Sequence, residues 1–188
     1  HTHYGYIAVD PSEGYVSQLT RKYGPKQTKY ILKNIECVWL SHFHEDHCFG
    51  IPSLLYERSK LTDKKIIFYG PQKFLDDINK ISSYYGDFKV IYHNREVEGR
   101  VQESEEDMSL VPNDLPIYHS IKYAKGCMFL IDGETTIAFS GDRGFQKDHF
   151  TEVFGNCDLL IHEATFDYKA LRNPKVRQIT KHCRINDA

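Results

Sequence analysis

The apolar and polar positions of the first half of the chain predict short strands that alternate with helices. Apolar runs of strand length occur at residues 6–9, 35–40, 65–69 and 88–92. A helical stretch after the first run stops at Gly24-Pro25, and another turn or two is predicted over 26–33. Amphipathic helices are predicted at about 50–60 and over 72–84.

The second half of the chain predicts a further set of strands. Runs at 127–131 and 135–139 flank Asp132-Gly133-Glu134, which predicts a hairpin. Shorter strands are expected at 115–118 and 158–161, with a helix at about 145–154. Six acidic residues between 95 and 107 predict a solvated loop at about 95–110. We therefore expect a layered α/β (α+β) fold, with residues 1–188 forming a single domain.

Composition narrows the class of protein. The 188 residues are 40% apolar with a formal net charge of −2, which excludes a disordered chain and a basic nucleic-acid coat. No apolar run reaches the ~20 residues of a membrane span, and no secretory signal is visible. Five cysteines without a CxxC pair argue against a disulfide framework, so we expect an intracellular protein with no membrane partner.

A dense cluster of metal-ligand side chains follows the apolar run at 35–40. The segment His42-Phe-His44-Glu-Asp46-His47 holds three imidazoles and a carboxylate suited to ligation within six residues. Imidazole nitrogen and carboxylate oxygen suit Zn²⁺, with Mn²⁺ or Fe²⁺ as alternatives in mixed sites. The competing interpretation, a His-rich polar loop, does not account for four ligand-type residues packed directly after a buried strand.

Four further side chains extend this candidate site. His119, Asp142 and His162 each follow a predicted strand, and His182 lies in Lys181-His182-Cys183. A strand end is a rigid support that can deliver a ligand to the rim of a sheet. Each residue alone is weak evidence, but together with the six-residue cluster they predict one metal site.

The motifs resemble those of a known family. His-x-His-x-Asp-His after an apolar strand is similar to the signature of the metallo-β-lactamase superfamily, which implies an αββα sandwich of two sheets flanked by helices. The segments starting at Val9-Asp10, Ser140-Gly141-Asp142 and His162-Glu163-Ala-Thr-Phe166 resemble tRNase Z, the endonuclease that trims tRNA 3′ trailers. The stretch Tyr69-Gly70-Pro71 is similar to the catalytic C-terminal half of the long form of that family.

This resemblance implies roles for the candidate residues. It implies two Zn²⁺ ions that activate water to cut precursor tRNA, leaving a tRNA 3′-hydroxyl and a trailer with a 5′-phosphate. Asp46 would accept the proton of the attacking water, and His162 would protonate the leaving oxygen. The alternative for His162 is to orient a ligand. The implied ligands are His42, His44 and His119 for one ion, Asp46, His47 and His182 for the other, and Asp142 bridging both.

The chain also departs from the family pattern. Arg143-Gly144 follows Asp142 where the family has Thr-Arg, and Cys183-Arg184 follows His182 where it has Ser-Thr, but no ligand is lost. The family has further segments ahead of Tyr6 and helices after the last histidine. We therefore expect the chain to be part of a larger catalytic domain, truncated at both ends. The resemblance implies an N-terminal pseudo-catalytic half or a homodimer as partner, and a nuclear or mitochondrial location.

Two basic clusters are visible. Residues 168–184 carry six cations and no acid, and we expect Lys175, Arg177 and Lys181 to hold RNA phosphates there. The cations between Arg21 and Lys33 are interpreted as a solvated helix face and are not assigned to RNA. Two other functions remain open: another hydrolase of the same fold (phosphodiesterase, thioesterase or sulfatase), or a non-catalytic partner module.

Overall fold

The computed structural model describes part of the chain, which divides into two compact units. Unit 1 comprises residues 1–102 and unit 2 residues 103–188. The helix predicted over 72–84, the acidic loop at about 95–110 and the helix at about 145–154 lie wholly or largely outside the described residues. Those residues are 5–70, 76–77, 80, 90–93, 113–117, 119–120, 124–144, 152, 154–165 and 182–183.

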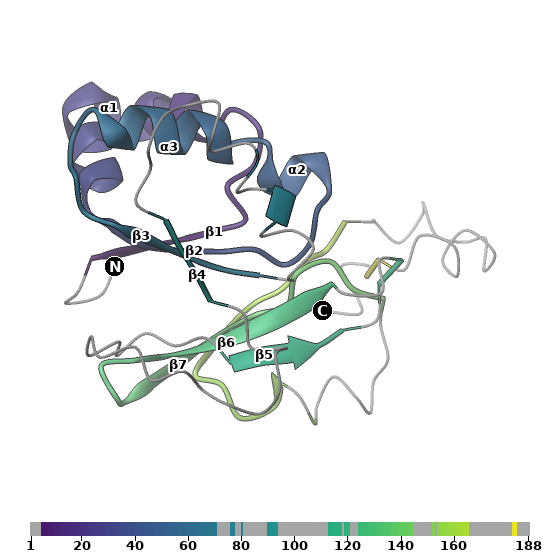
Figure 1. The fold of residues 1–188 in the computed structure, drawn as a ribbon. Helices are drawn as coiled ribbons and strands as arrows, with labels where there is room; N and C mark the ends of the chain where they lie inside the picture. The colour runs from purple at the N-terminus through teal and green to yellow at the C-terminus, as the bar shows by residue number, and fades with distance from the viewer. Residues whose placement is uncertain are drawn as a thin grey trace. The chain divides into compact units, whose positions relative to one another are not determined.

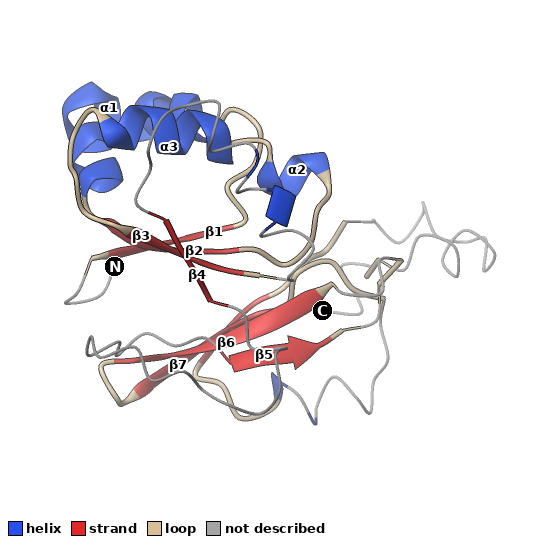
Figure 2. Ribbon diagram, viewed as in Figure 1, coloured by secondary structure: helices blue, strands red, loops and turns tan. Residues whose placement is uncertain are grey.

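Unit 1 is a parallel sheet with helices on one face (Figure 1). Its strands pair in the order β1 (Tyr6–Val9), β2 (Ile35–Trp39), β3 (Ile66–Tyr69) and β4 (Val90–His93). Parallel neighbours require long crossover connections. Two of these crossovers carry α1 (Tyr15–Lys33) and α3 (Ile51–Ser59), and Figure 2 shows both helices on the same face of the sheet.

The core of unit 1 lies between that helical layer and the sheet. Ile31 and Leu32 of α1, Leu54 of α3, and Val38 and Phe68 of the sheet form one buried apolar cluster. The predicted break in α1 is confirmed, because Gly24 has a φ of 78° and divides the helix directly before Pro25. The predicted strands at 6–9, 35–40 and 65–69 are confirmed to within one residue at each end.

Unit 2 contains a four-stranded mixed sheet. Its strands are β5 (Asn113–Pro116), β6 (Lys125–Ile131), β7 (Thr135–Phe139) and β8 (Leu159–Ile161), in that order. β5, β6 and β7 pair antiparallel, and β8 pairs parallel to β7. The predicted hairpin is confirmed, since Asp132 and Gly133 turn the chain with φ values of 52° and 74°, the backbone that a tight right-twisted hairpin requires.

The two sheets and their helices confirm the mixed α/β class expected from the sequence. Among the described residues, no helix combines the length and the apolar character needed to cross a bilayer. The prediction that residues 1–188 form a single domain stays a prediction.

A buried arginine joins three segments of unit 1. The Arg58 side chain, on α3, is only 4% exposed. Its guanidinium donates to the carbonyls of Ile35 at 3.2 Å, Lys64 at 2.7 Å and Lys65 at 3.3 Å. Burial lowers the pKa of Arg58, with a smaller opposing effect from Glu36. The rigid planar fork of arginine can meet several carbonyls at once, so this side chain fixes α3 against the starts of β2 and β3.

We predict that Arg58→Met lowers the free energy of unfolding by about 2–4 kcal/mol, because buried carbonyls lose their donors. Arg58→Lys should restore only part of the loss, since one ammonium group cannot reach all three carbonyls. Urea unfolding followed by circular dichroism measures both variants. The matched control is Lys60→Met, an exposed position two residues further along, which should leave the midpoint unchanged; an equal loss there would contradict the prediction.

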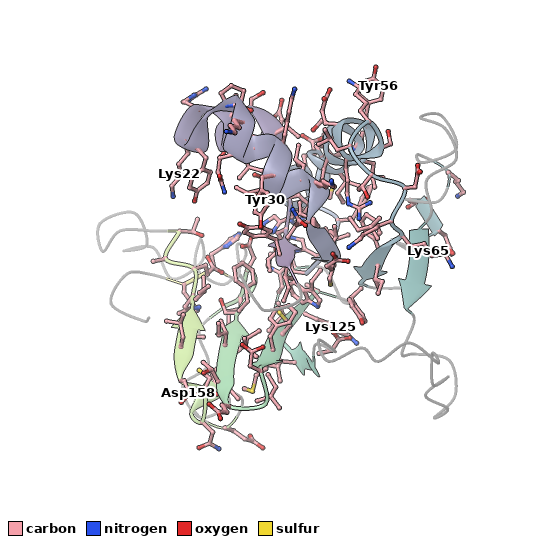
Figure 3. The ribbon with its side chains drawn as sticks, turned by 90° about the vertical axis from the view of Figure 1, so that its left-hand side faces the viewer. Lys22, Tyr30, Tyr56, Lys65, Lys125 and Asp158 are labelled. Carbon is pink, nitrogen blue, oxygen red and sulfur yellow. The ribbon has the colours of Figure 1, made fainter. Side chains whose placement is uncertain are left out.

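A carboxylate ties the starts of two strands in unit 2. Asp158, labelled in Figure 3, lies directly before β8. Its Oδ2 atom accepts hydrogen bonds from the backbone N–H and the hydroxyl of Thr136, both at 2.7 Å. The Asp158 N–H donates in return to the Thr136 hydroxyl at 3.0 Å. The N–H and hydroxyl donors hold the pKa of Asp158 below its ordinary value, because they favour the charged form.

We predict a pH-dependent contribution of Asp158 to stability. A carboxylate whose folded pKa is depressed stabilises the fold above its unfolded pKa of ~4, and the contribution is lost as pH falls through the folded value. Asp158→Asn should therefore lower the thermal midpoint at pH 7, and the difference from wild type should shrink below pH 4. In a Thr136→Val background the same substitution should have a smaller effect at pH 7. A difference that stays constant from pH 7 to pH 3 would contradict the assignment.

Candidate metal centre

The predicted ligand cluster of unit 1 follows β2 directly. His42 and His44 lie in the connection after the strand, and Asp46 and His47 lie in the single helical turn α2 (Glu45–Cys48). The His42 ring lies 4.5 Å from the His44 ring and 4.2 Å from the His47 ring, centroid to centroid. The Oδ2 atom of Asp46 is 3.6 Å from His47 Nε2. The structure therefore brings the three histidine rings together, and Asp46 lies beside His47 with its side chain exposed.

One carboxylate, Asp10, organises this cluster. It follows β1 in a left-handed backbone conformation with a φ of 43°. Its oxygens accept hydrogen bonds from the Ser41 N–H at 2.8 Å, the Ser41 hydroxyl at 2.6 Å and His47 Nδ1 at 2.8 Å. Asp10 therefore holds both the chain where it leaves β2 and the ring of a candidate ligand.

These hydrogen bonds determine which nitrogen atom of each ring can bind a metal. His47 must donate from Nδ1 to the Asp10 carboxylate, so its Nε2 keeps the lone pair. The Ser41 hydroxyl gives its proton to Asp10 and therefore accepts from His42 Nδ1, at 2.9 Å. His42 consequently also presents a lone pair on Nε2. Both rings are held in the tautomer that a metal site needs.

The spacing of the nitrogen atoms fits a shared ion. His42 Nε2 and His44 Nδ1 lie 2.8 Å apart. Two nitrogen ligands of a tetrahedral Zn²⁺, each at ~2.0–2.1 Å, are separated by about 3.3 Å, so a small ring movement and a shift of the His44 proton from Nδ1 to Nε2 convert this pair into a ligand pair. The donor set of neutral imidazoles and carboxylate also suits zinc.

Cys48 lies within this segment but does not behave as a ligand. Its thiol donates to the carbonyl of His44 at 3.1 Å. Burial, with smaller contributions from the carboxylates of Asp10, Asp46 and Glu45, raises the pKa of Cys48 to about 12. Because metals bind the thiolate, the protonated thiol is a structural contact.

Unit 2 brings together its own predicted residues. Asp142 follows β7, His162 follows β8, and His119 follows β5 by three residues. The His119 and His182 rings lie 5.4 Å apart between centroids, and His182 Nδ1 is 3.8 Å from the nearer Asp142 oxygen. Ligand atoms of Asp142, Glu163 and His182 all lie within 4.8 Å of one another, so this group could hold a metal ion.

Glu163 has the same part in unit 2 that Asp10 has in unit 1. One oxygen accepts the Arg143 backbone N–H, and the other accepts the Thr165 hydroxyl and His182 Nδ1, the latter at 2.9 Å. With these donors on its oxygens, Glu163 is better suited to orienting His182 than to binding an ion itself. Because Nδ1 carries the proton that Glu163 accepts, Nε2 is the nitrogen of His182 that carries the lone pair.

His162 is held by a serine. The Ser140 hydroxyl donates to the Gly141 carbonyl at 2.7 Å, so its oxygen accepts from His162 Nδ1, also at 2.7 Å. Burial lowers the pKa of His162, Glu163 opposes this effect, and Arg143 adds to it. The neutral ring is therefore favoured in the isolated chain, with its exchangeable proton fixed on Nδ1.

Sequence reasoning located the candidate ligands but missed the residues that orient them. Asp10 and Glu163 stand in the quoted motifs, yet neither was given a role. The missing signal is the pairing of each carboxylate with a histidine 37 or 19 residues away, which only the fold reveals. The predicted RNA-binding residues Lys175, Arg177 and Lys181 lie outside the described part of the chain and stay predictions.

Comparison with known proteins agrees with this geometry. A family described as Beta-lactamase superfamily domain matches residues 6–175, which is most of the chain. The chain belongs to this beta-lactamase superfamily. The resemblance drawn from the His-x-His-x-Asp-His motif is thereby confirmed.

Within the beta-lactamase superfamily, the proteins similar to this chain include tRNases Z. A mitochondrial tRNase Z of Arabidopsis thaliana is 34% identical over 84 residues, covering 41% of the chain and 9% of the relative. A ribonuclease Z of Bacillus velezensis is 25% identical over 186 residues, covering 71% of the chain and 59% of the relative. The crystal structure of human short-form tRNase Z matches with a TM-score of 0.70 and 23% identity, covering 97% of the chain and 73% of that structure, which supports the fold. The matched part of the chain thus covers about a tenth of the length of the Arabidopsis relative and about three fifths of the length of the Bacillus relative.

We predict that Asp10→Asn and Glu163→Gln each weaken zinc binding by about 10–100-fold, because each loses the charge that fixes a histidine tautomer. Competition with a chromogenic zinc chelator measures the affinity without any activity assay. Circular dichroism should show both variants folded. Asp63→Asn, an exposed carboxylate in the α3–β3 connection, is the matched control and should bind zinc as wild type does; unchanged affinity in both test variants would contradict the orienting role.

Proposed function

We propose that the protein is a zinc-dependent endoribonuclease that removes the 3′ trailer from precursor tRNA. The observation that carries the proposal is the pair of carboxylate-oriented histidine clusters, each presenting lone pairs suited to a divalent metal. The substrate is inferred from similar proteins named tRNase Z and ribonuclease Z. The expected products are a tRNA with a 3′-hydroxyl and a trailer with a 5′-phosphate.

The proposed ligand set is the one that the family resemblance implies. His42, His44 and His119 would hold one Zn²⁺, Asp46, His47 and His182 the other, and Asp142 would bridge them, with Mn²⁺ or Fe²⁺ as alternative ions. When bound, such a pair of ions lowers the pKa of a water molecule and stabilises the charge of an in-line phosphodiester displacement. The ring tautomers described above support the part of His42, His47 and His182 in this set.

Two side chains are proposed to move protons. Asp46 projects from α2 with its side chain 78% exposed, which leaves its carboxylate accessible to accept a proton from the attacking water. His162 keeps Nδ1 on Ser140, so Nε2 is the atom that would deliver a proton to the leaving oxygen. A phosphodiester at this ring adds negative charge nearby, which favours the protonated form of His162.

The substrate and cellular context follow from the same proposal. Lys175, Arg177 and Lys181 would contact RNA phosphates beside the reaction centre. The proposed protein partner is an N-terminal pseudo-catalytic half or a second copy of the chain. A mitochondrial location is supported by relatives named as mitochondrial, and a nuclear location rests on the family resemblance alone.

The test combines metal analysis with cleavage of a 3′-extended precursor tRNA. Zinc-reconstituted protein should contain two ions per chain and release the trailer in a single cut. His162→Ala should slow single-turnover cleavage about 10²–10⁴-fold, because leaving-group protonation is lost. Asp46→Ala should slow it further, because a ligand and a proton acceptor are lost together.

Glu45→Ala is the matched control, since Glu45 is an exposed acid in the same helical turn as Asp46. Its cleavage rate should equal that of wild type. A protein that binds two zinc ions but cuts only small phosphodiesters, thioesters or sulfate esters would overturn the tRNA proposal in favour of another hydrolase of the fold. A protein that binds no zinc would overturn the metal-dependent reaction itself.

A further inference from the structure

One face of α1 carries a stripe of positive charge. The helix contains Arg21, Lys22, Lys26, Lys29 and Lys33, all exposed, and no acidic residue over its 19 residues. This concentration stands out in a chain with 26 acids, 24 lysines and arginines and a net charge of −2. The charge of the chain is therefore unevenly distributed, and α1 is a local cationic surface.

The helix geometry places three of these lysines on one line. Residues spaced by three and four positions share a helix face, so Lys26, Lys29 and Lys33 form one stripe. The buried residues of α1, Thr28, Ile31 and Leu32, lie on the opposite face. At a rise of ~1.5 Å per residue the stripe is about 10 Å long.

These cations have no acidic partner among the residues that the structure describes. In contrast, Lys60 lies 2.8 Å from Glu57, Lys64 lies 3.8 Å from Glu36, and Lys80 lies 3.3 Å from Asp77. These three exposed lysines of unit 1 are thus matched with acids, whereas the exposed Lys65 and the lysines of α1 form no ion pair with a described residue. An unmatched stripe of this kind attracts a polyanion.

The helix dipole does not explain the whole stripe. Cations in the last turn of a helix are favoured by the partial negative charge there, which accounts for Lys33 and in part for Lys29. The dipole effect is confined to the terminal turn, and the break at Gly24 also places Arg21 and Lys22 in the last turn of the first helical segment, so it leaves Lys26 unexplained. Lys26 stands in the first turn after the break, where the dipole disfavours a cation, and requires another explanation.

Exposed aromatic rings accompany the cations. Tyr23 and Tyr30 are 47% and 54% exposed, and Figure 3 shows Lys22 and Tyr30 as side chains of α1. The Lys22 ammonium lies 5.3 Å from the centre of the Tyr23 ring. Interleaved cations and aromatic rings match the chemistry of an RNA backbone with accessible bases, since phosphates pair with lysine and bases stack on rings.

We infer that the exposed face of α1 is an RNA-docking surface, with Lys26, Lys29 and Lys33 contacting phosphates. This inference rests on the proposed function, which identifies the ligand of the surface as an RNA substrate. It differs from the expectation drawn from the sequence alone, which treated these residues as a solvated helix face.

The test compares two triple variants of the full chain with the same change in charge. Lys26, Lys29 and Lys33 are replaced by Gln in one variant, and the acid-matched Lys60, Lys64 and Lys80 in the other. Fluorescence anisotropy with a labelled 3′-extended precursor tRNA, in EDTA at four salt concentrations, measures binding without cleavage. The α1 variant should bind more weakly, and its log–log salt slope should fall by about two to three units, at ~0.7–0.9 per phosphate contact. The acid-matched variant should keep the wild-type slope.

The outcomes separate this inference from the proposed function. Equal salt slopes in the two variants, with the wild type cutting precursor tRNA, would overturn the α1 inference alone. A reduced slope in the α1 variant, with a wild type that cuts no tRNA, would support an RNA surface and overturn the proposed reaction. If the α1 variant binds RNA as the wild type does but no longer binds phosphatidylserine vesicles, the exposed face of α1 is a membrane-binding surface and the inference is overturned.

Discussion

The candidate site depends on one repeated constraint: a carboxylate that accepts a histidine Nδ1–H together with the backbone N–H of a ligand-bearing loop. Asp10 does this for His47 and Ser41 in unit 1, and Glu163 does it for His182 and Arg143 in unit 2. In each case a single side chain selects the tautomer of a ring and fixes the chain that leaves a strand. Orientation and tautomer are therefore determined before any ion is present, which lowers the conformational cost of binding one.

The fold of unit 1 is arranged so that Asp10 can reach its partners. β1 and β2 are parallel neighbours, so Asp10 and Ser41 leave the same edge of the sheet, and the Asp10 N–H donates to the Trp39 carbonyl at 2.9 Å. Gly50 then brings the start of α3 against the turn after β1, where its N–H donates to Pro11 at 2.9 Å. A Cβ atom at Gly50 would lie 2.0 Å from the Ser12 carbonyl oxygen, so only glycine permits this approach. The short turn α2 thereby lies between two anchored residues, Ser41 before it and Gly50 after it.

The sequence predicted most of the described strands, the kink in α1 and the ligand residues, because each depends on local signals. Apolar runs mark strands, Gly24-Pro25 marks a kink, and His-x-His-x-Asp-His concentrates ligands within six residues. The roles of Asp10 and Glu163 depend instead on contacts between distant segments, and an isolated carboxylate gives no local sign of its partner. The cationic stripe on α1 illustrates the same difference. The sequence shows the lysines, but only the fold shows that acids match Lys60, Lys64 and Lys80 and leave the α1 lysines unmatched.

The two departures from the tRNase Z pattern meet at one point in the structure. Arg143 stands where that family has Thr, and Cys183 where it has Ser; the Cys183 thiol donates to the Arg143 carbonyl at 3.1 Å. Glu163 uses the backbone N–H of Arg143, which any residue other than proline provides. A serine hydroxyl at position 183 could donate to the same carbonyl as the thiol. The contacts that hold Asp142 and His182 in place thus depend on main-chain groups and on a generic donor, so both substitutions change side chains while the support of the candidate ligands is kept. The new guanidinium lies 5.2 Å from the Phe154 ring centre, where cation–π contact accommodates its charge.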